Sequence, residues 1–171
     1  MTDKGNIAII GGGAAGLAAA VFAAESGGRP FIVEKNDRVG KKLRITGKGR
    51  CNVTNNSDVN THIANTLTNP RFMYGPLSNF TPADTMAFFE RLGVPLKTER
   101  GQRVFPVSDN ANDIVGALKN HLDRLGVPII HAAVDKILVQ NNDKSKAVGI
   151  STNNGDFSAD AVILASGGLS Y

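Results

Sequence analysis

Short apolar runs that end at glycine or at a charge dominate the start of the chain. Residues 6–10 form an apolar run of strand length that stops at three consecutive glycines, as a buried strand does when it enters a tight turn. Residues 14–25 are rich in alanine, with apolar positions at helical spacing, and 31–34 form a second apolar run. Strand, glycine turn, helix and strand within about 30 residues predict a βαβ unit with parallel strands.

The middle of the chain alternates polar stretches with amphipathic ones. Residues 81–92 predict a helix, because Thr81 can cap it, proline follows at the first helical position and Gly93 ends it. Residues 94–105 predict two short strands around Arg100 and Gly101, and 108–124 predict a second amphipathic helix. The polar, asparagine-rich stretch up to Asn69 predicts no firm element.

The last part of the chain returns to strands. Residues 127–130 predict a buried strand, and three short alternating segments between turn-rich breaks, one of them at 141–143, predict an antiparallel meander within 134–158. Residues 160–165 predict another buried strand that runs into Ser-Gly-Gly. The fold class is α/β: a Rossmann-type parallel sheet with helices on both faces, plus the meander. A strand of this kind normally leads into a helix or loop that covers its edge, so we expect the domain to be incomplete.

Composition supports one domain over residues 1–171, with 35–126 as a basic loop and helical insertion. The chain is 42% hydrophobic, enough for one ordinary core, and no apolar run approaches the roughly 20 residues that cross a bilayer. We therefore expect a cytoplasmic protein with no membrane partner. The single cysteine, Cys51, excludes an internal disulfide, and no local spacing of His or carboxylates predicts a metal site.

The positive charge is concentrated in one segment. The net charge is +4, yet residues 35–50 hold seven cations against Asp37, which leaves the rest of the chain at −2. A duplex-binding protein spreads its charge over a face and adds base-reading side chains, so a compact anion is the better candidate than nucleic acid. Lys41, Lys42 and Arg50 are candidates to pair with a pyrophosphate or an anionic substrate, with a solvated basic loop as the alternative.

The candidate chemistry lies in the glycine turn. Gly11-Gly12-Gly13-Ala14-Ala15-Gly16 fits the G-x-G-x-x-G pattern of dinucleotide-binding folds, and it follows a strand and opens a helix. Gly11 allows the tight turn, Gly13 lets a pyrophosphate approach the backbone, and Gly16 lets the helix close on the strand. The amides at the helix start, including those of Ala14 and Ala15, face the anion.

Glu34 lies 18 residues after Gly16, at the end of the second strand. A carboxylate there accepts hydrogen bonds from a ribose 2′-hydroxyl and repels a 2′-phosphate, so NADP is disfavoured at this site. A solvated carboxylate at a strand end is the alternative. The residues alone leave FAD and NAD both open.

The order of elements resembles the glutathione-reductase-like flavoproteins, in which an apolar strand ending in Ala-Thr-Gly, here Ala165-Ser166-Gly167, follows a meander. Three further blocks resemble the aminoacetone-oxidase-like or bile-acid 4,6-reductase-like NAD(P)/FAD-dependent oxidoreductases: residues 40–43, 49–55 and 103–108. The resemblance implies an N-terminal portion of a longer flavoprotein. Ser166 stands where Thr is usual, a change that keeps a hydroxyl.

The resemblance also extends the set of cofactor candidates. It implies that the side-chain amide of Asn52 contacts cofactor or substrate, with a loop-stabilising role as the alternative, and that the backbone of Val134 contacts adenine, with an ordinary core valine as the alternative. The full set of cofactor-binding candidates is Gly11, Gly13, Ala14, Ala15, Gly16, Glu34, Lys35, Lys41, Lys42, Arg50, Asn52, Val134, Ala165, Ser166 and Gly167.

The implied activity is that of an FAD-dependent oxidoreductase, in which a flavin exchanges a hydride with a small organic substrate and NAD(P)H is a possible electron donor. No acid, base or nucleophile stands at catalytic spacing, which is consistent with chemistry supplied by a cofactor, and the catalytic residues and oligomeric state are unknown. The alternatives are an NAD-dependent dehydrogenase domain and a non-catalytic module that binds a nucleotide or nucleic acid.

Overall fold

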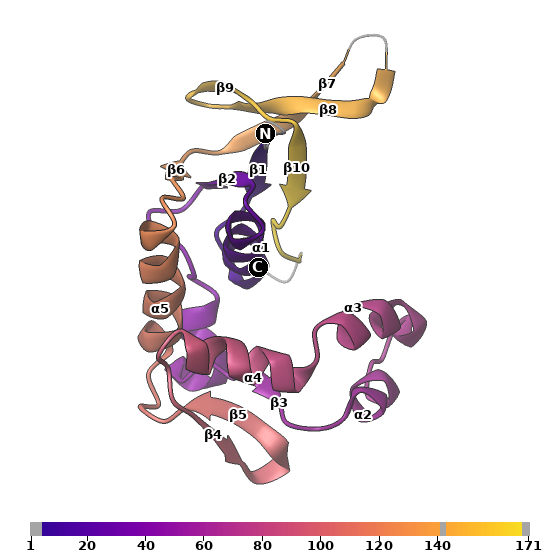
Figure 1. The fold of residues 1–171 in the computed structure, drawn as a ribbon, viewed down its shortest axis with the longest axis vertical. Helices are drawn as coiled ribbons and strands as arrows, with labels where there is room; N and C mark the ends of the chain where they lie inside the picture. The colour runs from indigo at the N-terminus through magenta and orange to yellow at the C-terminus, as the bar shows by residue number, and fades with distance from the viewer. Residues whose placement is uncertain (1–4, 141–142, 169–171) are drawn as a thin grey trace. The chain divides into compact units, whose positions relative to one another are not determined.

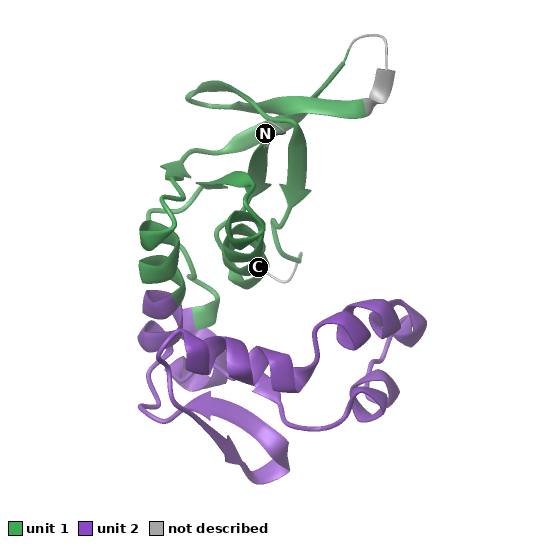
Figure 2. Ribbon diagram, in the orientation of Figure 1, with its two compact units in different colours: residues 1–43, 118–171 green, residues 44–117 purple. Residues whose placement is uncertain are grey.

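The computed structural model describes residues 5–140 and 143–168, and these residues fall into two compact units. Figure 2 shows unit 1, residues 1–43 and 118–171, in green and unit 2, residues 44–117, in purple. Unit 2 falls inside the 35–126 stretch that the sequence sets apart. Of the turn predicted at 141–143, Asn141 and Asn142 lie outside the described residues.

Unit 1 is built on a parallel sheet of four strands, ordered β10-β1-β2-β6 (Figure 1). The strands are β1 (Asn6–Ile10), β2 (Arg29–Glu34), β6 (Ile129–His131) and β10 (Ala161–Leu164). Helix α1 (Ala14–Glu25) connects β1 to β2 and packs against both. The predicted βαβ unit is therefore confirmed, and β1 is central, with β2 on one side and β10 on the other.

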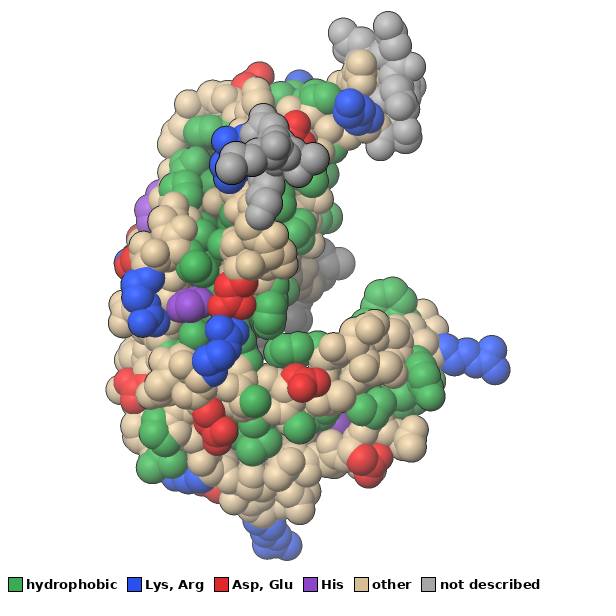
Figure 3. All heavy atoms as spheres, in the orientation of Figure 1, with side chains coloured by type: hydrophobic (Ala, Val, Ile, Leu, Met, Phe, Trp, Pro, Cys, Tyr) green, Lys and Arg blue, Asp and Glu red, His purple; other side chains and the backbone are tan. Residues whose placement is uncertain are grey.

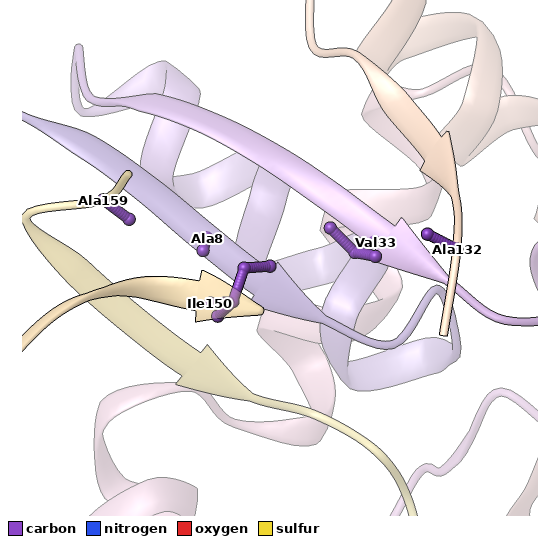
Figure 4. Packing of buried hydrophobic residues seen from close by; sticks show 5 residues of the cluster. All are labelled: Ala8, Val33, Ala132, Ile150 and Ala159. Carbon is purple, nitrogen blue, oxygen red and sulfur yellow. The ribbon is translucent and has the colours of Figure 1, made fainter. Parts of the chain in front are cut away.

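The meander forms the second layer of unit 1. It consists of β7 (Val134–Gln140), β8 (Asp143–Thr152) and β9 (Gly155–Ser158), paired antiparallel as predicted. Ile150 of β8 packs in one buried cluster with Ala8 and Val33 of the parallel sheet, as Figure 4 shows. Because successive side chains of a strand point to opposite faces, Ala8 and Val33 belong to one face and Ile9 and Ile32 to the other. On the Ala8 face the meander takes the place of the helical layer that we expected there.

Unit 2 contains a small antiparallel sheet ordered β3-β5-β4 and the helix that packs beside it. Its strands are β3 (Thr54–Asn55), β4 (Leu96–Glu99) and β5 (Arg103–Pro106), with a 3₁₀ turn, η3 (Arg100–Gln102), between the last two. Helix α4 (Pro82–Arg91) begins at Thr81, which forms a reciprocal capping box with Asp84. Both predictions, the strand pair around Arg100 and the capped helix, are confirmed.

Two short helices were not predicted, one within the polar stretch and one between it and Thr81. Unit 2 also holds α2 (Val59–Ala64) and α3 (Tyr74–Asn79), with the 3₁₀ segments η1 (Leu43–Gly49) and η2 (Pro70–Met73). None of these four has a buried residue, so they produce no apolar periodicity for a sequence pattern to detect. The predicted helix at 108–124 is present as α5 (Ala111–Arg124), within which the division between the units falls. No helix among the described residues is long and apolar enough to span a membrane.

Candidate cofactor-binding site

The glycine turn connects β1 to α1, and its backbone lies in close contact with the backbone of neighbouring residues. Gly11 has a φ of +107°, in the region that favours glycine, and its amide donates to the carbonyl of Val33 at 2.8 Å. A Cβ at Gly11 would lie 2.4 Å from the carbonyl oxygen of Ala165, and one at Gly16 would lie 1.8 Å from the carbonyl oxygen of Gly11. Neither position admits a side chain, so the tight turn predicted at Gly11 is confirmed and α1 closes directly onto the turn at Gly16.

Gly13 has the opposite environment. It is the N-cap of α1 in an extended conformation, no side chain caps this helix end, and a Cβ built there meets nothing within 4 Å. Ala14 and Ala15, in the first helical turn, are exposed. The start of an α-helix presents backbone N–H groups that need acceptors, together with the positive end of the helix dipole. The open space beside Gly13 thus fits a pyrophosphate.

Glu34 lies beside this turn, and both oxygens of its carboxylate accept hydrogen bonds. Its side chain is buried, with 7% of the residue exposed. Oε2 accepts from the amide of Gly12 at 2.7 Å, and Oε1 accepts from both the backbone amide and the side-chain nitrogen of Asn36. The alternative of a solvated carboxylate at the end of the strand is therefore wrong.

The end of β10 lies against the same turn. The amide of Ala165 donates to the carbonyl of Ile10 at 2.9 Å, and Ser166 and Gly167, which follow, are exposed. In open α/β sheets, ligands bind outside the carboxyl ends of the strands, at the point where the strand order reverses and the connections from two adjacent strands run to opposite sides. β1 stands at that point, between β2 and β10. The structure therefore brings the glycine turn, Glu34 and residues 165–167 to one edge of the sheet.

Four further candidates belong to unit 1. Lys35, Lys41 and Lys42 are exposed. Val134 begins β7 opposite Thr152 and packs against the cluster around Ile150, as a core valine does. Contacts of these four residues with a cofactor remain predictions. On the face drawn in Figure 3, the Lys and Arg side chains of the described residues are scattered, with acidic side chains among them.

Arg50 belongs to unit 2 and is held there by acidic partners. Its Nη1 lies 2.9 Å from Oε1 of Glu99 and 3.2 Å from Oδ1 of Asp109, and its guanidinium lies 4.0 Å from the centre of the Phe105 ring. Lys97 also contacts Asp109, at 2.6 Å. The hydrogen bond from Arg50 holds the pKa of Glu99 below its usual range, and the bond from Lys97 lowers that of Asp109. Arg50 thus has two anionic partners within its own unit.

The two residues that follow Arg50 are also fixed within unit 2. The side-chain amide of Asn52, oriented with its nitrogen toward carbonyl oxygens, donates to Thr54 at 3.0 Å and to Val104 at 3.2 Å. This contact favours the loop-stabilising role for Asn52, and a contact with cofactor or substrate stays a prediction. Cys51 is buried, and its burial raises the pKa of the thiol.

The structure also shows three participants that sequence reasoning missed: Gly12, Asn36 and His131. Gly12 and Asn36 supply the donors to Glu34, and Nδ1 of His131 donates to the backbone carbonyl of Asn36 at 2.7 Å. Asn36 lies two residues after Glu34, a spacing at which a polar side chain can donate a hydrogen bond to the carboxylate. This spacing is the sequence feature from which the contact could have been predicted. His131 is 97 positions from Glu34 in sequence and reaches it only through the pairing of β2 with β6.

These features define a dinucleotide-binding Rossmann domain with a bare helix start and a carboxylate at the end of the second strand. The chain belongs to the family described as "HI0933-like protein Rossmann domain", whose model matches residues 5–171. The domain is therefore a Rossmann domain of this family, and its glycine turn and Glu34 suit the ADP part of a dinucleotide such as FAD.

Individual relatives support this placement. The chain is 38% identical over 165 residues to a 3-dehydro-bile acid delta(4,6)-reductase from Clostridium scindens. The matched segment covers 95% of this chain and 39% of the relative. It is 29% identical over 164 residues to a ribosomal RNA dihydrouridine synthase from Haemophilus influenzae, covering 95% of this chain and 40% of that protein. The fold matches a flavocytochrome c3 fumarate reductase with a TM-score of 0.71 at 22% identity, covering 98% of this chain and 34% of that one. The chain thus spans about two fifths of the length of these two relatives.

Proposed function

We propose that this domain holds the FAD of an oxidoreductase that transfers a hydride between the flavin and a small organic substrate. The observation that carries the proposal is the uncapped start of α1 beside Gly13, with the buried carboxylate of Glu34 at the same edge of the sheet. Together they suit the two polar parts of an ADP group, the pyrophosphate and the ribose.

Each part of the site has a separate role in this proposal. The amides at the start of α1 bind the pyrophosphate, Glu34 accepts a hydrogen bond from the ribose, and residues 165–167, of which Ser166 and Gly167 are exposed, border the cofactor. Lys41 and Lys42 supply charge that attracts the anionic cofactor or an anionic substrate. The isoalloxazine ring, when bound, supplies the hydride chemistry, while the protein binds and orients it.

The relatives favour reduction as the direction of the reaction. One is named as a reductase of a bile acid and the other as a synthase of dihydrouridine, and both names denote the addition of hydrogen to a substrate. The relative of higher identity is the one named for a small molecule. We therefore propose a small, unsaturated organic substrate, with NAD(P)H as the electron donor, for the complete protein. A cytoplasmic location also remains a prediction.

The test is an anaerobic titration of the purified protein. We expect bound flavin, which NADH or NADPH bleaches and which an unsaturated bile acid or steroid reoxidises. Reoxidation by unmodified ribosomal RNA instead would contradict the small-molecule substrate. A protein that binds NAD but no flavin would support the dehydrogenase alternative.

A further inference from the structure

A chain of hydrogen bonds connects Glu34 with the neighbouring strand β6. Asn36 donates twice to Oε1 of Glu34, from its backbone amide at 2.8 Å and from its side-chain Nδ2. The carbonyl of Asn36 accepts from Nδ1 of His131 at 2.7 Å, and the carbonyl of His131 accepts from Nδ2 of Asn154 at 3.2 Å. Asn36 is therefore held from two sides, by the carboxylate that it contacts and by the strand next to it.

This arrangement restricts how Glu34 can accept a further hydrogen bond. A carboxylate has about four acceptor positions. The two donors of Asn36 occupy Oε1, and Gly12 occupies one position on Oε2. The remaining position is on Oε2, the oxygen that faces the glycine turn. Three donors hold this buried carboxylate in one orientation, and without the Asn36 side chain only the two backbone donors, Gly12 and Asn36, would hold it.

We propose that Asn36 is a positioning residue that sets the selectivity of this site for a ribose with a free 2′-hydroxyl. The inference rests on the proposed function, since it requires the ADP part of FAD to lie at Glu34. A ribose 2′-hydroxyl donates a hydrogen bond to the open position on Oε2, and a 2′-deoxyribose has no donor there. A 2′-phosphate is repelled by the negative charge of a carboxylate that is held in place. Asn36 acts through Glu34 and contributes no chemistry of its own.

The experiment measures selectivity, since a residue with only a structural role changes the affinity for all nucleotides alike. ADP and 2′-deoxy-ADP are titrated into the flavin-loaded protein, and the rise in fluorescence of released FAD gives the concentration of each that displaces half of it. In the unaltered protein, we expect ADP to displace half of the FAD at about tenfold lower concentration than 2′-deoxy-ADP does. This ratio is the expected effect of losing one hydrogen bond to a charged group.

Two variants and a control complete the test. Asn36→Ala removes Nδ2, and Asn36→Asp keeps the shape of the side chain but places an acceptor against Oε1, so both should bring the ratio of the two concentrations close to one. Asn79→Ala, which removes an exposed amide that bonds within its own helix, should leave the ratio unchanged. If Asn36→Ala fails to fold, the isosteric Asn36→Asp decides.

The outcomes separate the two proposals. A ratio that stays near tenfold in both folded Asn36 variants overturns the positioning role and leaves the proposed function intact. A ratio near one in the unaltered, flavin-loaded protein also overturns it, because Glu34 then does not read the 2′-hydroxyl. A protein that holds no flavin overturns the proposed function, and the inference with it.

Discussion

The carboxylate of Glu34 accepts a hydrogen bond from the backbone amide of Gly12 at 2.7 Å, although the two residues are 22 positions apart. This contact ties the end of β2 to the turn that precedes α1. The carboxylate thus stabilises the glycine turn in addition to its proposed contact with the ribose. The two parts of the site, one for phosphate and one for ribose, are consequently a single hydrogen-bonded unit of the fold.

The first prediction concerns Gly16, where helix and turn are in closest contact. In Gly16→Ala, the new Cβ would overlap the carbonyl oxygen of Gly11, and backbone atoms must move to relieve the overlap. We expect the free energy of unfolding to fall by about 3 kcal/mol or more, at or above the usual range for overpacking. Denaturant unfolding measures this change. Gly75→Ala in α3, where a Cβ meets nothing within 4 Å, is the control and should be close to neutral; equal stability of both variants would contradict the packing argument.

The sequence predicts the elements whose signals are local. The glycine turn, the helix cap at Thr81 and the meander are encoded by residues a few positions apart, and all three are present. Helices α2 and α3 were missed because they bury no side chain. The partners of Arg50 were also missed, since Glu99 and Asp109 lie 49 and 59 positions away and approach it only once unit 2 has folded.

The second prediction concerns the acid stability of the charged cluster Arg50, Lys97, Glu99 and Asp109. The hydrogen bonds to Glu99 and Asp109 lower the pKa of both carboxyls in the folded protein. Their stabilising effect is therefore complete above the unfolded pKa values, which are about 4, and is lost as the pH falls through the lower folded values. We expect the double variant Glu99→Gln, Asp109→Asn to have a lower Tm at neutral pH and a shallower fall of Tm below about pH 4.

Thermal unfolding over a range of pH checks this second prediction. Asp123→Asn is the control, because Asp123 makes an exposed ion pair with Lys119 one helical turn away, and such pairs contribute little. Its curve should follow that of the unaltered protein. A double variant whose curve runs parallel to that of the unaltered protein would show that the cluster adds nothing to acid sensitivity.

The third prediction concerns Cys51. Its side chain is buried, and burial raises the pKa of the thiol, so both access and the thiolate fraction are reduced at neutral pH. We expect a thiol reagent to label the native protein far more slowly than the protein in denaturant, and Cys51→Ser to retain its flavin. Rapid labelling of the native protein, accompanied by loss of activity, would instead indicate a reactive thiol at the site.

The most direct test of FAD binding at the start of α1 is the flavin content of Gly13→Ala. The backbone of Gly13 is extended and its surroundings are open, so the substitution leaves the fold intact while its methyl group enters the space assigned to the pyrophosphate. We measure visible flavin absorbance per protein after incubation with FAD, together with the Tm. We expect stoichiometric FAD in the unaltered protein and in the Gly75→Ala control, and a folded Gly13→Ala variant with little or none. An unaltered protein that stays colourless, or a Gly13→Ala variant that keeps its full flavin, would contradict FAD binding at this helix start.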